Sequence, residues 1–157
     1  MRIRRAMIVD GPAICELINE YAERGLMLHR SLESVYTSLR DFHVAEQDGR
    51  VIGCVATHVF WSDLAEIKSL AVATKDRGRG VGRALVSAAV ADARALGVDK
   101  LFALTYEVAF FAQMGFEPME RDALPEKVWR ECIACPKFDA CDETAMVRML
   151  DTSDSER

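Results

Sequence analysis

The segment from Lys75 to Leu85, KDRGRGVGRAL, alternates glycines with arginines directly before an apolar helical pattern. Glycine has no Cβ, so a ligand can come close to the main chain, and the first amides of a helix are unpaired at the positive end of its dipole. Arginine adds forked donors that suit phosphate oxygens. We therefore predict a site for a phosphorylated ligand on the main-chain amides from Arg77 to Gly82. The alternative interpretation is an ordinary turn with a solvated basic face.

Two common phosphate-binding motifs do not fit this segment. No Lys-Ser or Lys-Thr pair closes the loop, as a P-loop requires. In the dinucleotide-binding fingerprint the third glycine would fall at Arg83, and the loop lies in the middle of the chain rather than after a first strand. The ligand is therefore not expected to be held in either of these two ways.

The composition is that of a globular protein with one domain. The chain has 157 residues, of which 50% are hydrophobic and 29% are charged. Its formal net charge of −5 argues against binding to nucleic acid or to an acidic membrane surface. No apolar run is long enough to cross a bilayer, and the N-terminal residues lack the apolar stretch of a signal peptide. We expect a cytoplasmic protein with a small-molecule partner, and the sequence leaves a homodimer open.

Hydrophobic periodicity and turn residues predict alternating strands and helices. The expected elements are a strand in 1–7, a helix from its cap Asp10 to Gly25, a helix from its cap Ser31 to about Arg40, a hairpin over 42–61 turning at Asp48-Gly49, a strand over 64–73, a helix from the glycine loop to about Leu96, a strand over 100–105, a short helix over 107–114 and a last strand over 144–150. This order predicts one α/β domain (α+β in arrangement) with a mixed sheet over residues 1–150, and residues 151–157 read as a disordered tail.

The order of these elements, together with the segments RGRGVG (77–82) and FAQMGF (111–116), resembles the GCN5-related N-acetyltransferase (GNAT) superfamily. The resemblance implies the GNAT fold, a single, mostly antiparallel mixed sheet flanked by helices and splayed at its central strands. It also implies that the ligand is acetyl-CoA, bound as co-substrate. The diphosphate would bind Arg77, Gly78, Arg79, Gly80, Val81, Gly82 and Arg83. The pantetheine arm would pair with the main chain of Leu70, Ala71 and Val72 as an added strand, on an edge opened by a local bulge.

A narrower resemblance is carried by the segments GLMLHRSLESVY (25–36), AEIKSLAV (65–72) and LTYEVAFFAQMGF (104–116), which look like short bacterial N-acetylglutamate synthases. It implies acetyl transfer to the α-amine of L-glutamate for arginine biosynthesis. By matching positions, Arg30 would hold a substrate carboxylate, Glu66 would act on the amine, and Thr105 would protonate the leaving thiolate. An arginine suits a carboxylate because its donors form a bidentate pair.

Acetyl transfer to an amine needs a base for the amine, a main-chain amide facing the carbonyl oxygen and help for the leaving thiolate. Glu66 is the candidate base, and burial on its strand would raise its pKa. The alternative is a surface carboxylate paired with Lys68, and Lys68 could instead neutralise a substrate carboxylate. The superfamily's usual tyrosine acid is replaced here by Phe111, which leaves Thr105 and Tyr106 as donors.

Two other functions remain compatible with the sequence. The same fold could acetylate another small amine or a protein lysine, or it could bind acetyl-CoA as a sensor without catalysis. The cysteines Cys132, Cys135 and Cys141 could form a disulfide, stay free or bind metal, and three such ligands fall short of a tetrahedral zinc site. No metal site is therefore predicted.

Overall fold

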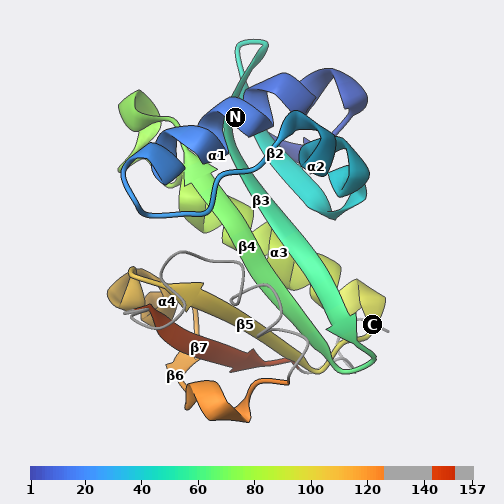
Figure 1. Ribbon diagram of the computed structural model, residues 1–157, viewed down its shortest axis with the longest axis vertical. Helices are drawn as coiled ribbons and strands as arrows, with labels where there is room; N and C mark the ends of the chain where they lie inside the picture. Colours follow the sequence, from blue (N-terminus) through green and yellow to red (C-terminus); the bar gives the residue numbers. More distant parts are fainter. Residues whose placement is uncertain (126–142, 151–157) are drawn as a thin grey trace. The chain divides into compact units, whose positions relative to one another are not determined.

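The computed structural model describes residues 1–125 and 143–150 (Figure 1). The strands are β1 (Arg2–Arg5), β2 (Phe42–Gln47), β3 (Arg50–Trp61), β4 (Leu64–Val72), β5 (Lys100–Thr105), β6 (Glu117–Pro118) and β7 (Thr144–Met149). The helices are α1 (Gly11–Glu23), α2 (Leu32–Thr37), α3 (Val81–Leu96) and α4 (Val108–Gln113), with short 3₁₀ turns at Ile8–Asp10, Leu39–Asp41, Thr74–Asp76 and Arg121–Ala123. No helix in the described parts of the chain is long and apolar enough to cross a membrane.

The strands form one mixed sheet in the order β1-β2-β3-β4-β5-β7-β6. The described pairs are antiparallel except for β4 with β5, which is parallel. That parallel pairing joins only Leu64 to Lys100, Ala65 to Leu101 and Glu66 to Phe102. The mixed, mostly antiparallel sheet flanked by helices confirms the predicted fold class. The remainder of β4, from Ile67 to Val72, has no described partner on its β5 side.

The contacts divide the chain into two compact units, and each is described separately. The first unit comprises residues 1–58 and 67–92, and the second comprises residues 59–66 and 93–157. In the first unit α1 and α2 pack on one face of the sheet. The buried cluster between them consists of Ile14, Leu17, Ile18, Val35, Leu39, Phe42, Val44, Cys54, Ala56 and Ala71.

The first turns of α3 cover the opposite face of β3. Cys54 faces the cluster under α1, and because neighbouring strand residues point to opposite faces, Gly53 faces the other way. A Cβ on Gly53 would lie 2.9 Å from Leu85 Cδ1 and 3.1 Å from Val81 Cγ1. Glycine therefore lets α3 approach β3 closely, and in Figure 1 this helix passes behind β3 and β4.

The second unit has a smaller core. Leu64, Phe102, Leu124 and Ala145 are buried together, with Phe60, Leu104, Met119 and Val147 packed around them. The antiparallel pairing of β5 with β7 runs from Lys100–Met149 to Thr105–Thr144. The strand β6 was not expected from the sequence, because two residues carry no alternating pattern.

Most elements begin and end near the predicted residues. Three predictions, about a helix cap, a helix end and a buried residue, were wrong. Asp10 precedes α1 but its side chain does not cap that helix; it accepts hydrogen bonds from Arg4 and from the main-chain amide of Met7. Helix α2 ends at Thr37, because Leu39–Asp41 forms a 3₁₀ turn, although Ser31 caps α2 as expected. Leu96, expected on the apolar face of α3, is 57% exposed. The predicted tail, 151–157, lies outside the described residues.

Candidate functional site

The glycine loop adopts a conformation that only glycine reaches without strain. Gly78 has a φ of +75° and Gly80 a φ of +84°. A Cβ added at either position would meet no atom within 4 Å. These glycines are therefore required for the left-handed backbone rather than for space. The two left-handed residues lead directly into α3, which begins at Val81.

The main-chain amides of this loop are available to a ligand. The first helical bond of α3 runs from Ala84 N to Gly80 O at 3.1 Å, so three amides of the helix, from Val81 to Arg83, precede it. Within the described residues, the amides of Gly78, Arg79 and Gly80 donate to no main-chain acceptor. A run of such donors at a helix start can bind phosphate oxygens.

The arginines around the loop point into solvent. Arg77, Arg79 and Arg83 are all exposed. The side chain of Arg79 is 60% exposed, and its Nη1 donates to Asp76 at 3.2 Å, which holds the charge beside the loop. The guanidinium of Arg77 lies 4.7 Å from the centroid of the Tyr21 ring. The predicted loop residues thus combine unpaired amides with positive charge, as a diphosphate requires.

A break in β4 lies just before the predicted pantetheine edge. Ser69 has a φ of +56°, which is uncommon for a residue other than glycine inside a strand. Its carbonyl oxygen accepts a weak hydrogen bond from Cys54 Sγ at 3.4 Å. This irregularity agrees with the expected local bulge. It separates Glu66 and Lys68 from Leu70–Val72 on one continuous strand.

The predicted edge of Val72 already has a partner from α1. The hydroxyl of Tyr21 donates to Val72 O at 3.0 Å and accepts from Val72 N at 3.2 Å. Sequence periodicity places Tyr21 on the apolar face of its helix. That pattern does not predict a hydrogen bond to a strand residue 51 positions away. A ligand that pairs with Val72 has to replace the tyrosine hydroxyl.

Arg30, the predicted carboxylate-binding residue, lies in the link between α1 and α2. Its Nε donates to Ser34 Oγ at 3.2 Å, and its Nη1 donates to Ser69 Oγ at 3.3 Å. The guanidinium carbon lies 5.3 Å from the centroid of the Phe42 ring. Arg30 thus joins the cap region of α2 to the left-handed residue of β4, with an aromatic face beneath it.

The main chain of Arg30 is held by Asn19 of α1. Asn19 Oδ1 accepts from Arg30 N, and Asn19 Nδ2 donates to Arg30 O, both at 2.9 Å. Cys15, one helical turn earlier, also donates to that carbonyl oxygen at 3.4 Å. Asn19 was not predicted from the sequence as a residue of the candidate site. A polar amide among the apolar residues of α1 is the signal that could have identified it.

The two predicted catalytic residues belong to the second unit. Glu66 is 6% exposed and Thr105 is 7% exposed, so both are buried. Glu66 lies opposite Phe102 where β4 and β5 pair, and Thr105 ends β5. The hydroxyl oxygen of Thr105 accepts a hydrogen bond from Glu107 N at 2.8 Å, so its own hydrogen points elsewhere.

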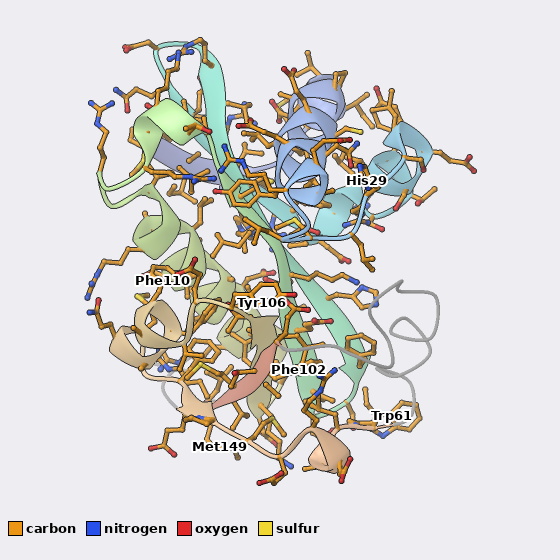
Figure 2. All side chains as sticks on the ribbon, turned by 60° about the vertical axis from the view of Figure 1, so that its left-hand side comes forward. His29, Trp61, Phe102, Tyr106, Phe110 and Met149 are labelled. Carbon is orange, nitrogen blue, oxygen red and sulfur yellow. The ribbon has the colours of Figure 1, made fainter. Side chains whose placement is uncertain are left out.

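Two aromatic residues of the second unit, Phe111 and Tyr106, bear on which group could protonate the leaving thiolate. Phe111, at the position where the superfamily usually has its tyrosine, is 4% exposed and packs edge-on against Phe110 and Phe116, with both centroid distances 5.2 Å. It has no acidic proton and serves the core. Tyr106 directly follows β5, and Figure 2 labels it and Phe102, which belongs to that strand.

Histidine and cysteine side chains are further candidates for metal ligands or catalytic groups outside the site described above. His29 is exposed and bonds to Glu23 at 2.8 Å, and Figure 2 shows it in the link near α1 and α2. Burial raises the pKa of the Cys54 thiol to about 12, so it stays protonated. In residues 1–125 and 143–150, no three His, Cys, Asp or Glu side chains are grouped to hold a metal. Cys132, Cys135 and Cys141 lie outside these residues.

The chain is similar to several known proteins. The family model described as acetyltransferase (GNAT) family matches residues 12–116. An uncharacterized N-acetyltransferase of Chlorobaculum tepidum is 45% identical over 148 residues, which cover 94% of this chain and 96% of that protein. An amino-acid acetyltransferase of Mycobacterium tuberculosis is 39% identical over 140 residues, which cover 87% of this chain and 79% of that protein.

A solved structure shares the fold. The N-acetylglutamate synthase from Neisseria gonorrhoeae, complexed with coenzyme A and N-acetyl-glutamate, matches with a TM-score of 0.86 at 33% identity. The match covers 96% of this chain and 35% of that one, so this chain corresponds to about a third of that protein.

Proposed function

Because the chain belongs to the acetyltransferase (GNAT) family, and is an acetyl-CoA-dependent N-acetyltransferase of the amino-acid acetyltransferase type, we propose that its acceptor is the α-amine of L-glutamate. The product, N-acetyl-L-glutamate, would enter arginine biosynthesis. The observation that carries this proposal is the placement of Arg30. Its guanidinium is oriented by Ser34 and Ser69 and lies over the Phe42 ring.

An oriented arginine favours a carboxylate over a second amine. The two serine hydroxyls, the Ser34 carbonyl oxygen and the aromatic face fix the plane of the guanidinium, and a guanidinium is the side chain whose shape best matches a carboxylate. A polyamine or lysine acceptor would bring a positive charge to this arginine. Lys68, which precedes Ser69 on β4, is the residue we propose for the second positive charge, opposite the other carboxylate of glutamate.

In this proposal the co-substrate lies on the first unit. Its diphosphate binds the amides from Gly78 to Arg83, with Arg77, Arg79 and Arg83 around it. Its pantetheine arm pairs with Leu70–Val72 beyond the break at Ser69. The fit is supported by the absence of main-chain partners for the loop amides in the described chain and by the end of the described β4–β5 pairing at Glu66, beyond which the Tyr21 hydroxyl is the described partner of Val72.

The chemistry follows from direct attack without an acyl-enzyme. Glu66 takes the proton from the ammonium group of glutamate, directly or through one water. The amine nitrogen then attacks the thioester carbonyl carbon and the C–S bond breaks. The second proton that the nitrogen loses passes to the leaving thiolate with the help of the Thr105 hydroxyl. An amide of the β4 edge faces the carbonyl oxygen as it gains negative charge.

Thiol release from acetyl-CoA tests the proposal, with a panel of amino acids, polyamines and a lysine peptide as acceptors. We expect release that depends on L-glutamate, with a KM for glutamate raised at least tenfold in Arg30→Ala, as loss of a charge-assisted bidentate pair implies. Arg30→Lys keeps the positive charge but loses the forked pair of donors, so its KM for glutamate should lie between those of the wild type and of Arg30→Ala. Preference for a polyamine or a lysine peptide would contradict the acceptor, and cofactor binding without turnover on any amine would indicate a sensor.

A further inference from the structure

Tyr21 takes both main-chain hydrogen bonds of Val72 with a single hydroxyl. The hydroxyl hydrogen goes to Val72 O at 3.0 Å, and a lone pair of the same oxygen accepts from Val72 N at 3.2 Å. An added strand makes the same pair of contacts with a strand edge, one to the N–H and one to the C=O. Tyr21 therefore occupies Val72 as a bound strand would.

The edge concerned is the one that faces away from β3. The next residue, Ala73, donates its amide to Ile52 O of β3 at 2.8 Å. Because successive main-chain groups of a strand point to opposite edges, the N–H and C=O of Val72 point away from β3. This is the edge on which the proposed function places the pantetheine arm, so the inference rests on that proposal.

Tyr21 is also connected to the glycine loop. Arg77, the first residue of the loop, lies with its guanidinium 4.7 Å from the centroid of the Tyr21 ring. A cation at this distance is attracted to the ring face, and a phosphate would compete for the same cation. One side chain thus touches the two surfaces assigned to different parts of the co-substrate.

The helix that carries Tyr21 is tied to the start of the loop by other contacts. Thr74 Oγ1 donates to Glu20 at 2.7 Å and accepts from Arg24 at 3.2 Å. These contacts do not involve Tyr21, so α1 remains attached to the loop when the Tyr21 hydroxyl leaves Val72. Tyr21, Val72, Thr74 and Arg77 all belong to the first unit.

We propose that Tyr21 is a cofactor-site residue whose hydroxyl occupies the pantetheine position on Val72 until coenzyme A replaces it. Binding of the diphosphate draws Arg77 away from the ring, and the two successive amides of the pantetheine arm then take over the two main-chain bonds. The hydroxyl consequently lowers the affinity for ligands that carry pantetheine. It has no such effect on the same nucleotide without the arm, because that ligand does not reach Val72.

The variant Tyr21→Phe tests this inference, because it removes the hydroxyl and keeps the ring under Arg77. Calorimetry would compare the binding of coenzyme A with that of 3′-phosphoadenosine 5′-diphosphate, which lacks pantetheine. We expect Tyr21→Phe to bind coenzyme A about three- to tenfold more tightly, the range for one net hydrogen bond, and the nucleotide with unchanged affinity. Tyr36→Phe, on the exposed side of α2, is the matched control and should change neither.

Weaker binding of coenzyme A by Tyr21→Phe, or an equal change for both ligands, would overturn the inference. Amide exchange at Val72 gives a second measurement that does not depend on affinity. In the wild type this amide should exchange slowly with the nucleotide bound, and in Tyr21→Phe it should exchange fast until coenzyme A is added. Slow exchange in both proteins also contradicts the role. If wild-type protein binds no coenzyme A, the proposed function fails as well, whereas tight binding unaffected by Tyr21→Phe overturns this inference alone.

Discussion

Asn19 holds Arg30 by both of its main-chain groups, with its side-chain oxygen on Arg30 N and its side-chain nitrogen on Arg30 O, each at 2.9 Å. Arg30 belongs to a link outside the regular helices, so no helical hydrogen bonds fix it there. A side-chain amide can replace such bonds, because it offers one donor and one acceptor in a plane, as a peptide group does. Asn19 therefore acts as a positioning residue for the arginine to which we assign a substrate carboxylate.

The variant Asn19→Ala should raise the KM for glutamate about five- to thirtyfold, the effect of losing two hydrogen bonds that orient a binding residue. The value of kcat should change less than threefold, and the affinity for coenzyme A should not change, because the described hydrogen bonds of the Asn19 side chain go to Arg30 and Cys15 and not to the glycine loop. Steady-state kinetics with varied glutamate and calorimetry with coenzyme A measure these quantities.

Two further variants control for loss of structure. Asn19→Asp keeps the acceptor for Arg30 N and loses the donor to Arg30 O, so its KM should also rise. Glu16→Ala changes an exposed residue of the same helix and should leave the KM unchanged. Equal shifts in the KM for glutamate and the Kd for coenzyme A in Asn19→Ala would indicate general loosening of the unit and count against a positioning role.

The left-handed glycine of the loop gives a second prediction. Gly80→Ala should weaken coenzyme A binding at least tenfold, because a residue with a Cβ resists a φ of +84° and turns the loop amides away from the diphosphate. Steric contact is not the reason, since no atom lies within 4 Å of the added Cβ. Titration calorimetry provides the Kd, and thermal unfolding provides the stability.

Gly49 is the matched control for this variant. It has a φ of +76° in the hairpin between β2 and β3, and an added Cβ there also meets nothing within 4 Å. Gly49→Ala should lower Tm by a similar amount and leave coenzyme A affinity unchanged. A normal Kd for Gly80→Ala alongside a lowered Tm would mean that the loop does not bind the diphosphate through its main chain.

The sequence predicts the elements well where local patterns determine them. The Asp48-Gly49 turn, the Ser31 cap and the glycine loop before Val81 are local, because backbone conformation and nearby hydrogen bonds decide them. Asp10 looks like a helix cap by the same local rule, but Arg4 of a neighbouring strand takes its carboxylate instead. Tertiary contacts thus override local preference where a charged partner is within reach.

The sequence indicates the candidate site less completely than the fold. Family-like motifs mark Arg30, Glu66 and the loop as candidate residues, since these residues stand in recognisable segments. They do not identify Tyr21 or Asn19, because the partners of these side chains are main-chain groups distant in sequence. Every residue has the same main-chain groups, so a contact with them produces no recognisable sequence pattern. Only the folded structure reveals such contacts.

The pair of Arg4 and Asp10 predicts a pH dependence of stability. The two side chains form hydrogen bonds of 2.7 and 3.0 Å, and Asp10 is 4% exposed. Hydrogen bonds from Arg4 hold the pKa of Asp10 below its usual value, although burial opposes them. Because the folded pKa is depressed, the stabilisation is present above the unfolded pKa, near 3.8, and disappears as the pH falls through the folded value.

We expect Asp10→Asn to lower the free energy of unfolding by about 1–3 kcal/mol at pH 7. The difference from the wild type should close as the pH falls below about 4, where the unfolded carboxyl becomes protonated. Urea unfolding at a series of pH values measures both. Glu46→Gln, which removes the more exposed partner of Arg4, should have a smaller effect. A gap for Asp10→Asn that is the same at pH 3 and pH 7 would exclude the ion pair as its cause.

Thr105 gives a prediction for the leaving group. Thr105→Val keeps the shape of the side chain but removes the hydroxyl, which also leaves Glu107 N without its acceptor at 2.8 Å. We expect kcat to fall about ten- to a hundredfold with little change in coenzyme A affinity. Thr105→Ser keeps the hydroxyl and should retain kcat within a few fold. Full activity of Thr105→Val would assign the proton to another donor, such as Tyr106.

The assignment of Glu66 as general base predicts both a rate and a pH profile. Glu66→Gln should lower kcat/KM for glutamate by about 10²- to 10⁴-fold, the usual contribution of a positioned base, and should abolish the acid limb of the profile. Glu117→Gln, an exposed carboxylate of the same unit, controls for the change in charge and should leave both unaltered. Stopped-time thiol assays from pH 5 to pH 9 would separate the cases. If Glu66→Gln retained the wild-type acid limb, the titrating group would be the substrate amine or another residue, and Glu66 would be left with a structural role beside Phe102.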